Sequence, residues 1–246
     1  MITEEKPYRV HFSCGAASAV SLLLAVESGK FHDAWYADTG GEHADNARFF
    51  RDIEQYSSVK INIVKSDKYI SPFDVWSKKR FIAGAFGATC PSELKKLPLK
   101  HVMTLDVTHV FGFTSEEATR FENRQKDNQP IKIASLLIER NFSKNDCYQY
   151  LMARNIKLPK MYELGFNNAN CIGCPKGGKG YWNHIRKHFP NQFNKVAELQ
   201  QDLGEGSYFW EGKGGKRISL FDLKPNEGRH DEPNIECGLF CANGGL

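Results

Sequence analysis

Along the first part of the chain, stretches with two different spacings of hydrophobic residues alternate. Stretches in which apolar and polar residues alternate are typical of strands, and stretches in which apolar residues recur every three or four positions are typical of helices. The predicted strands are residues 8–13, 33–40 and 60–66, and the predicted helices are residues 18–29 and 46–57. Gly15 and Gly29, which favour tight turns, end the first strand and the first helix. This alternation predicts an α/β fold with a doubly wound, Rossmann-like parallel sheet.

The pattern is weaker toward the C-terminus. Further strands are expected at residues 109–113 and 131–137, and further helices at residues 143–155 and 180–203. Ser143 is expected to cap the first of these helices, and Pro190 to break or kink the second. A Gly-rich stretch then predicts a short hairpin, and residues 224–236 predict a polar tether or flap. We expect residues 1–165 to form the α/β domain, with residues 166–246 as an integrated C-terminal region of CxxC segment, helix and flexible tail.

The predicted sheet also predicts where a ligand would bind. Doubly wound sheets bind ligands outside the carboxyl ends of their strands. Three predicted loops lie at that edge, at residues 13–18, 38–45 and 112–120. We therefore expect a binding site to join these three loops.

Small residues make up the loop after the first strand, FSCGAAS at residues 12–18. They let the backbone approach an anion, the next helix supplies free N–H groups at its N-terminus, and Ser13 and Ser18 add hydroxyl donors. The loop has neither the GxGxxG pattern nor the Lys of a Walker A sequence, so a simple tight turn is the alternative. Cys14 is either a reactive thiol, activated by the helix N-terminus, or only a small residue.

The second loop begins with Asp38 and Thr39 at a predicted strand end. These two side chains could bind a ribose, an adenine edge or a metal ion. The alternative is a structural role for this loop, in which Asp45 or Asn46 caps the following helix.

Composition narrows the class of protein only slightly. Of the 246 residues, 41% are hydrophobic, and the formal net charge is +4. This mild positive charge suits an anionic substrate but is too weak to predict nucleic-acid binding by itself. The apolar stretch at residues 19–26 is too short to cross a bilayer and lacks the features of a signal peptide. We therefore expect a cytoplasmic protein with no membrane partner.

Seven cysteines are the most distinctive feature of the composition. In a reducing cytosol they do not predict a disulfide framework. Cys171 and Cys174 form a CxxC pair, which predicts either a metal clamp or a redox pair, the alternative being a turn with two small buried thiols. Cys90 is a third candidate ligand. Cys147 lies within a helical pattern and is expected to be a buried core residue.

Several of these stretches, in order, resemble the phosphoadenosine phosphosulfate (PAPS) reductase family of the adenine nucleotide α-hydrolase-like superfamily. They are FSCGAASAV (12–20), DTGGEHADNARFF (38–50), CPSELKKLP (90–98), FGFTSEEATRFEN (111–123), the segment 150–174 and ECGL (236–239). The resemblance implies an adenine nucleotide ligand on a modified P-loop, that is, PAPS, adenosine phosphosulfate or ATP. The nucleotide-binding residues that it implies are Ser13, Cys14, Gly15, Ser18, Asp38, Thr39, Gly40, Lys95 and Arg120, with Lys96 as a further anion contact.

One departure from the superfamily concerns the reaction. The ATP-hydrolysing branch has a P-loop of the type SGGxDS, and Ala17 stands here in place of its Asp. This loss argues against pyrophosphatase chemistry and for the reductase branch. The resemblance then implies an oxidoreductase that releases sulfite, with a thioredoxin-like dithiol as electron donor and a homodimer as its assembly.

The resemblance also gives the cysteines roles. In iron–sulfur members of the family, two early cysteines and a later CxxC pair hold a [4Fe–4S] cluster, and Cys90, Cys171 and Cys174 resemble three of these four ligands. This chain has one early cysteine instead of two, so Cys237 or Cys241 would supply the fourth ligand, and the other terminal thiol would be the catalytic nucleophile. Zinc is the alternative metal for four cysteines.

Two other functions stay open at this point. The first is an ATP-dependent adenylating or thiolating enzyme that acts on RNA or DNA. The basic and aromatic residues at positions 176–189 favour this function. The second is a nucleotide-binding protein without turnover. The alternative for residues 176–189 is an ordinary amphipathic helix with a solvated basic face.

Overall fold

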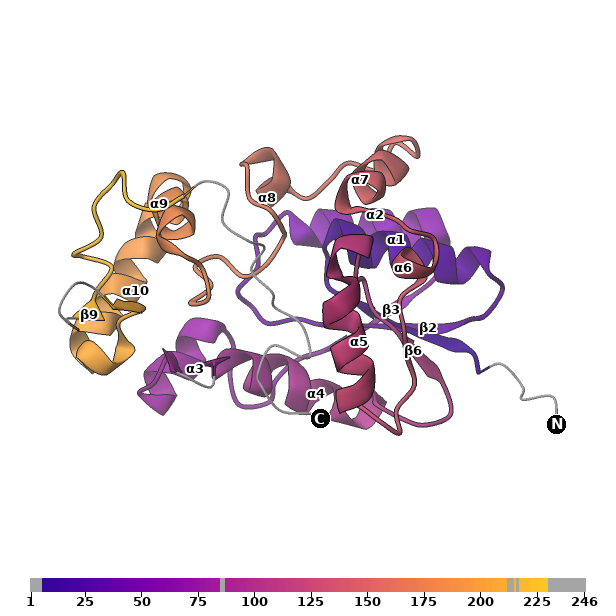
Figure 1. The fold of residues 1–246 in the computed structure, drawn as a ribbon, viewed down its shortest axis with the longest axis horizontal. Coiled ribbons are helices and arrows are strands. Elements are labelled where there is room, and N and C mark those ends of the chain that lie inside the picture. Colours follow the sequence, from indigo (N-terminus) through magenta and orange to yellow (C-terminus); the bar gives the residue numbers. More distant parts are fainter. Residues whose placement is uncertain (1–5, 85–86, 212–214, 216, 230–246) are drawn as a thin grey trace.

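A five-stranded parallel sheet forms the centre of the molecule (Figure 1). The structure is a computed structural model that describes residues 6–84, 87–211, 215 and 217–229. The strands, in their order across the sheet, are β3 (Ile61–Val64), β2 (Phe31–Ala37), β1 (Tyr8–Phe12), β6 (Thr108–Val110) and β7 (Ile133–Ala134). The chain thus winds outward from β1 in both directions, as the doubly wound prediction requires.

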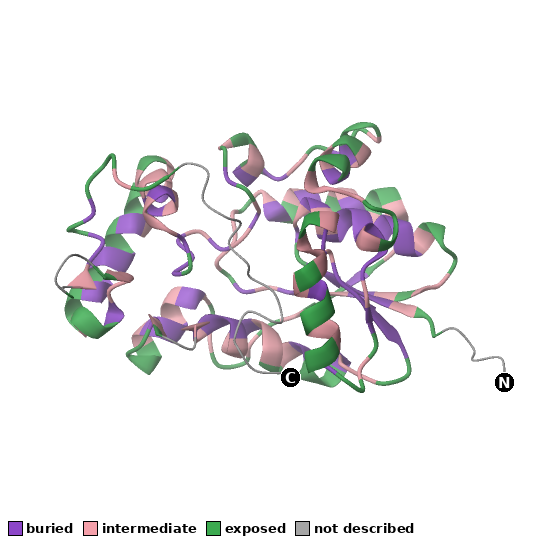
Figure 2. Cartoon of the chain, viewed as in Figure 1, coloured by how far each residue is buried: buried purple, intermediate pink, exposed green. Residues whose placement is uncertain are grey.

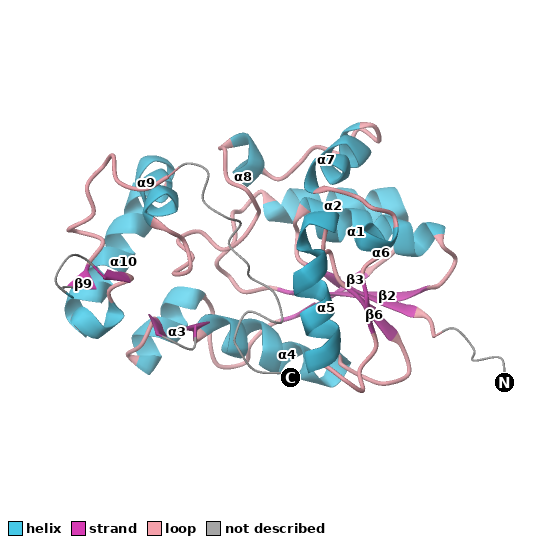
Figure 3. Ribbon diagram, in the orientation of Figure 1, coloured by secondary structure: helices cyan, strands magenta, loops and turns pink. Residues whose placement is uncertain are grey.

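Ten helices are present in the described residues, and helices cover both faces of the sheet (Figure 3). They are α1 (Ala16–Glu27), α2 (Asn46–Ser57), α3 (Pro72–Lys79), α4 (Leu97–Leu99), α5 (Ala118–Asp127), α6 (Leu136–Glu139), α7 (Lys144–Met152), α8 (Lys160–Glu163), α9 (Lys179–His188) and α10 (Pro190–Leu203). A π-helical turn (Ser92–Lys96) precedes α4, and 3₁₀ turns lie at Lys100–Val102, Ser115–Glu117 and Glu205–Ser207. The remaining strands form two short antiparallel pairs, β4 (Ala83–Gly84) with β5 (Gly87–Ala88), and β8 (Trp210–Glu211) with β9 (Arg217–Ile218).

Most predicted elements are confirmed, with shifted ends. The predicted helix at residues 180–203 is two helices, because the rigid ring of Pro190 starts α10 one residue after α9 reaches its C-cap. Ser143 caps α7, and its hydroxyl accepts a hydrogen bond from the Asp146 amide at 3.1 Å. The strand expected at residues 131–137 is reduced to β7, since α6 begins at Leu136.

The sheet is held by two apolar layers of different composition. Above β1 and β2, α1 is buried on nearly all sides because it lies between the sheet and helices α6 and α7. On the other face, Leu99, Val102 and Phe121 pack against the ends of β6 and β7. Figure 2 shows this burial, with purple strands between helices whose outer faces are green. The packing of these two layers holds β1, β2 and β6 in place, and with them the edge of the sheet at which these strands end.

A third apolar cluster lies away from the sheet, on the side of α9 and α10 in Figure 1. Trp76 of α3 and Trp182 of α9 are fully buried there, together with Phe193 and Leu220. We call residues 161–223 with α3 and residues 82–94 the cysteine region, because Cys90, Cys171 and Cys174 belong to it. Its core therefore combines segments from both sides of residue 165, the boundary predicted from the sequence.

Two further findings concern the ends and the surface. None of the helices in the described ranges is long and apolar enough to cross a membrane. Cys237 and Cys241 lie outside the described residues, as does most of the predicted tether at residues 224–236, of which 224–229 are described.

Candidate nucleotide-binding site

The turn between β1 and α1 is closed by its own serine side chains. The Ser18 hydroxyl accepts a hydrogen bond from the Ser13 amide at 3.1 Å and donates one to the Gly15 carbonyl at 2.9 Å. The Ser13 hydroxyl lies 3.1 Å from that of Ser18. Cys14, at φ 55°, takes the left-handed conformation that brings the chain into the helix. The turn is therefore preformed at the start of α1, where amide groups gather.

A tyrosine from α8 reaches the same helix start. The Ala16 amide donates a hydrogen bond to the Tyr162 hydroxyl at 3.1 Å. Burial raises the pKa of Tyr162 to about 12, so this hydroxyl is neutral. Sequence reasoning missed Tyr162 as a site residue, although it lies in the segment 150–174 that carried part of the family resemblance. The second half of the chain thus contributes directly to the loop after β1.

Close packing joins the loop after β6 to the loop after β1. A Cβ atom on Gly112 would lie 2.7 Å from the Ser18 amide nitrogen and 2.9 Å from the Ala17 carbonyl carbon. Only glycine permits this approach, because distances below 3.0 Å force the backbone apart. The prediction that loops 13–18 and 112–120 meet is confirmed.

These loops border a cavity of about 210 Å³ at the carboxyl ends of β1, β2 and β6. Ser13, Gly15, Ala17 and Ser18 line one side of it, and the segment Trp35–Ala37 lines another. Its charged lining residues are Glu42, Lys95, Glu117, Arg120 and Lys144. The predicted residues Ser13, Gly15, Ser18, Lys95 and Arg120 are thus brought together at one cavity.

The electrostatics of the cavity favour an anion. Three cationic side chains face two carboxyl groups, and burial raises the pKa of the Glu42 carboxyl, which favours its neutral form. Arg120 donates a hydrogen bond to Glu117 at 2.5 Å and lies 5.0 Å from the ring centre of Phe113. Burial lowers the pKa of the Lys144 ammonium, against the opposing effect of Glu117 and Glu116. Glu42 and Lys144 were not predicted from the sequence.

Four predicted nucleotide-binding residues lie beside the cavity rather than in its described lining. Asp38 forms an ion pair with Lys65 at 2.7 Å, and its carboxylate accepts a hydrogen bond from the Gly40 amide at 2.9 Å. Thr39 is buried. Gly40 has φ 64°, and a Cβ atom there would lie 2.0 Å from the Ile70 carbonyl oxygen. These contacts shape the second loop, and nucleotide contacts from Asp38, Thr39 and Gly40 stay predictions.

Cys14 has the environment of a small buried residue. Its thiol is 1% exposed and donates a long hydrogen bond to the Asn46 carbonyl at 3.9 Å. Burial, and next the charge of Glu42, raise the pKa of this thiol far above its ordinary value. The structure therefore favours the second of the two roles predicted for Cys14, since a reactive thiol needs a lowered pKa.

The predicted alternative for the second loop, a helix cap, is wrong in its detail. Asp45 stands at the N-cap position of α2, but its side chain accepts no capping hydrogen bond from that helix. Instead the carboxylate accepts two hydrogen bonds from Arg48, both at 2.8 Å, and one from the Lys160 amide at 2.8 Å. Asp45 thereby links α2 to the start of α8.

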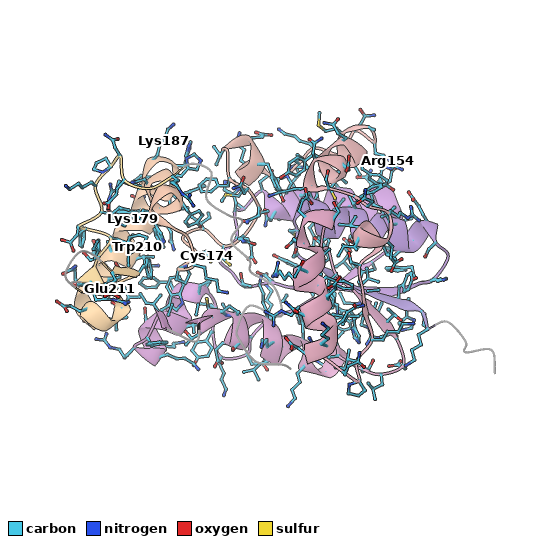
Figure 4. All side chains as sticks on the ribbon, viewed as in Figure 1. Arg154, Cys174, Lys179, Lys187, Trp210 and Glu211 are labelled. Atoms are coloured by element: carbon cyan, nitrogen blue, oxygen red, sulfur yellow. The ribbon has the colours of Figure 1, made fainter. Side chains whose placement is uncertain are left out.

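The CxxC turn docks on this second loop. The Ile172 amide donates to the Gly41 carbonyl at 2.8 Å, and the Cys171 sulfur lies 3.1 Å from the Thr39 hydroxyl. The Tyr181 hydroxyl closes the turn, because it accepts hydrogen bonds from the amides of residues 173 and 174, both at 3.0 Å, and donates to the Cys171 carbonyl at 3.2 Å. Figure 4 labels Cys174, on the side of the molecule that carries α9 and α10.

The described residues do not by themselves make a metal site. Within them, no three side chains of His, Cys, Asp or Glu gather in a way that could hold a metal ion. Cys90, Cys171 and Cys174 are all buried, and the fourth predicted ligand, Cys237, lies beyond the described ranges. The [4Fe–4S] cluster and its zinc alternative therefore stay predictions, and no reaction step below depends on them.

Residues 176–189 behave as the amphipathic helix that was the alternative to a nucleic-acid surface. Trp182 and Ile185 are fully buried. On the polar side, Lys179 pairs with Glu227, and Arg186 donates a hydrogen bond to the Leu223 carbonyl at 2.6 Å. These basic groups are engaged within the cysteine region, which favours a packing role for them.

A doubly wound parallel sheet with an anion-favouring cavity at its switch point defines an α/β protein of the Rossmann-like class. Comparison with known families gives the particular family. Residues 7–177 match the phosphoadenosine phosphosulfate reductase domain, and the chain belongs to this family.

One solved structure agrees with this assignment at the level of the fold, and two other proteins are similar to the chain. The PAPS reductase of Candida auris, solved as a phosphate complex, superimposes with a TM-score of 0.51 at 12% identity, over 69% of this chain and 83% of that one. An NMN synthetase of Francisella tularensis gives a TM-score of 0.44 at 10% identity, over 86% and 90% of the two chains. An uncharacterized protein of Methanocaldococcus jannaschii is 27% identical over 218 residues, which cover 85% of this chain and 44% of that relative. The chain thus spans less than half of the length of this relative.

Proposed function

We propose that this protein is a sulfonucleotide reductase, which binds an adenosine phosphosulfate-type nucleotide in the cavity and reduces its sulfate group to sulfite. The observation that carries the proposal is the chemistry of the cavity lining. The serine-closed turn at the start of α1 and the cations Lys95, Arg120 and Lys144 border the same space. Such a lining suits the phosphosulfate end of the nucleotide.

Ala17 supports a reductase over an ATP-hydrolysing enzyme. It lies in the cavity lining, at the position where the ATP-hydrolysing branch would have its carboxylate. Glu42 does not readily replace that carboxylate, since burial raises its pKa and favours the neutral form. A P-loop without that carboxylate suits a sulfonucleotide, whose cleavage at sulfur needs no metal-bound pyrophosphate.

The proposed reaction has two balanced steps. An enzyme thiolate, Cys237 or Cys241, attacks the sulfate sulfur and forms an S–S bond, while the S–O bond to the phosphate breaks and the nucleoside phosphate leaves with the electron pair. A thioredoxin-type dithiol then attacks this S-sulfocysteine. The dithiol becomes a disulfide, the enzyme thiol is regenerated, and sulfite leaves as sulfur passes from the +6 to the +4 state.

The test measures products from three nucleotides in parallel. Anaerobically purified protein is given PAPS, adenosine phosphosulfate or ATP with a thioredoxin-type dithiol, and sulfite and pyrophosphate are measured. We expect sulfite from one of the two sulfonucleotides, its loss in either Cys237→Ser or Cys241→Ser, and full activity in the control Cys147→Ser. Pyrophosphate from ATP without sulfite would favour the ATP-dependent alternative. Tight nucleotide binding without any product would favour a protein without turnover.

A further inference from the structure

Two nitrogen-bearing rings form the inner wall of the cavity. His11 of β1 and Trp35 of β2 are directly paired across the parallel strands, and both line the cavity. His11 stacks on Phe111, with ring centres 4.4 Å apart and an angle of 6° between the rings. Leu99 and Phe113 also line the cavity. This wall is flat, aromatic and largely apolar.

A chain of hydrogen bonds fixes which nitrogen of His11 carries the proton. His109 Nε2 lies 2.9 Å from the Thr104 carbonyl oxygen, which can only accept, so Nε2 of His109 is protonated. Burial lowers the pKa of both imidazoles, His11 and His109, and the rings are neutral. His109 Nδ1 is therefore an acceptor, and His11 Nε2, 3.0 Å away, must donate to it. It follows that His11 Nδ1 is unprotonated and can only accept.

This acceptor is buried and has no hydrogen-bond partner among the described residues. His11 is 7% exposed, and its Nδ1 lies on another edge of the ring from the one that meets His109. The neighbouring Trp35 Nε1, a donor, also has no partner in the described part of the chain. A buried acceptor without a partner costs free energy unless a ligand satisfies it.

We propose that His11 accepts a hydrogen bond from the amino group of a purine base, and that the neighbouring Trp35 donates one to a ring nitrogen of that base. This inference rests on the proposed function, because it places an adenine nucleotide in the cavity. His11 lies two residues before Ser13, about 7 Å deeper along the strand than the turn assigned to the phosphosulfate end. A flat aromatic wall suits a base better than a sugar.

The fixed tautomer makes the site selective. The 6-amino group of adenine donates a hydrogen bond to an acceptor, whereas the 6-oxo group of hypoxanthine offers only an acceptor to the same atom. A 6-oxo base would leave His11 Nδ1 buried and unsatisfied. A site built in this way discriminates against an analogue that lacks the required donor. His109 acts as a positioning residue, since it holds His11 in the accepting tautomer.

The first experiment compares binding of amino and oxo nucleotides. Titration calorimetry with adenosine 5′-phosphate and adenosine 3′,5′-bisphosphate is set against their inosine counterparts. We expect the adenine form to bind about tenfold or more tightly. His11→Phe keeps the ring stack but removes the acceptor, and should bring the ratio of affinities close to one. His32→Phe, at a half-exposed site outside the cavity lining, is the matched control and should leave the ratio unchanged.

A second measurement tests the tautomer without any ligand or variant of His11. The ¹⁵N chemical shifts of the imidazole nitrogens should show His11 protonated at Nε2 and not at Nδ1. His109→Phe should release this preference and lower the discrimination between amino and oxo nucleotides. A protonated Nδ1 in the parent would overturn the inference, even if His11→Phe failed to fold.

The outcomes separate this inference from the proposed function. Equal affinity for adenine and inosine nucleotides would overturn the inference and leave the proposed function standing. If no adenine nucleotide bound at all, both would be overturned. Selective adenine binding that persisted in folded His11→Phe would show that other groups read the base, and would also overturn the inference.

Discussion

The cavity wall and the cysteine region bury their polar groups in different ways. Along the sheet, buried polar side chains are tied to one another: Arg9 binds Asp33 at 2.7 Å, and His11 leads through His109 to a backbone carbonyl. In the cysteine region an apolar, aromatic core surrounds the CxxC turn, and a single hydroxyl, that of Tyr181, ties the turn together. The first region forms a cavity from described residues, whereas the second contains three cysteines whose fourth predicted co-ligand, Cys237 or Cys241, lies outside the described residues.

Nucleotide binding and thiol chemistry can therefore be tested separately, although the cysteine region borders the cavity. The cavity is lined by the loops after β1 and β6 and by the segment Trp35–Ala37, and Tyr162 and residues 167–170 of the cysteine region complete its lining. The proposed nucleophile and fourth metal ligand belong to the tail. A variant in the loops after β1 and β6 should therefore change nucleotide affinity, and one in the CxxC turn should change metal content or stability, with little effect of either variant on the other property.

The largest effect is expected from Gly112→Ala. The added Cβ atom would lie 2.7 Å from the Ser18 amide nitrogen, so the loop after β6 must move away from the loop after β1. We expect at least a tenfold loss of affinity for the adenine nucleotide, measured by calorimetry. Gly206→Ala is the matched control, because a Cβ atom there meets no atom within 4 Å and should leave affinity unchanged. Unchanged affinity in folded Gly112→Ala would show that the joined loops do not shape the site.

The metal content of the protein tests the role proposed for the cysteine region. Iron, zinc and acid-labile sulfide are measured in anaerobically purified parent protein, Cys171→Ser and Cys174→Ser. We expect iron with sulfide in the parent and loss of most of both in the two variants, because each removes a proposed thiolate ligand. Cys147→Ser is the control, since Cys147 is buried in α7 and away from the CxxC turn.

Each other metal result has a distinct meaning. Zinc without sulfide would make the cysteines a structural clamp. A parent protein free of metal would contradict the cluster and leave the CxxC turn as a packing feature. Nucleotide affinity should not change in either variant if the two regions are independent.

A smaller effect is expected from Tyr181→Phe. The hydroxyl is buried and serves two amide donors and one carbonyl acceptor of the CxxC turn, so its removal leaves these groups unsatisfied. We expect a loss of about 1–3 kcal/mol in the free energy of unfolding, measured by urea denaturation. The half-exposed Tyr56 gives the control, Tyr56→Phe, with a change within about 0.5 kcal/mol. Equal stability of the two variants would mean that the turn is held by its apolar surroundings.

The sequence predicts the sheet region well for physical reasons. Strand and helix periods are local signals, and parallel topology then places the loops at residues 13–18 and 112–120 at one edge. The small residues and the serine hydroxyl groups of residues 13–18 are therefore readable as part of a site. The family resemblance adds Lys95 and Arg120, which line the cavity.

Other parts of the site depend on contacts between distant segments. Nothing local marks Tyr162 as a partner of the Ala16 amide, since 146 residues separate them. In the sequence, His11 and Trp35 are ordinary strand residues, and only the pairing of β1 with β2 places them side by side. Asp38 and Thr39 stand at a strand end, as a site would require, yet their described contacts are with Lys65 and Cys171. Local pattern cannot distinguish a loop that binds a ligand from one that binds the rest of the chain.

The smallest effect concerns the joint between the two regions, which Asp45 and Arg48 form. Arg48 donates hydrogen bonds to the Asp45 carboxylate and, at 2.9 Å, to the Leu158 carbonyl just before α8, the helix that carries Tyr162. The hydrogen bonds that the Asp45 carboxylate accepts, first from Arg48 and then from the Lys160 amide, lower the pKa of Asp45 to about 2. Because the pKa is lower in the folded state, Asp45 stabilises the fold above pH 4, and this contribution is lost as the pH falls through about 2.

Asp45→Asn therefore gives a pH-dependent prediction. At pH 7 the variant should lose about 1 kcal/mol in the free energy of unfolding, a value reduced by solvent screening of this partly exposed pair. The difference from the parent should shrink as the pH is lowered from about 4 and vanish near 2. Urea denaturation across this range measures it, with Asp67→Asn at an exposed site as control. A difference that stayed constant with pH would show that the charge of the Asp45 carboxylate does not stabilise this contact.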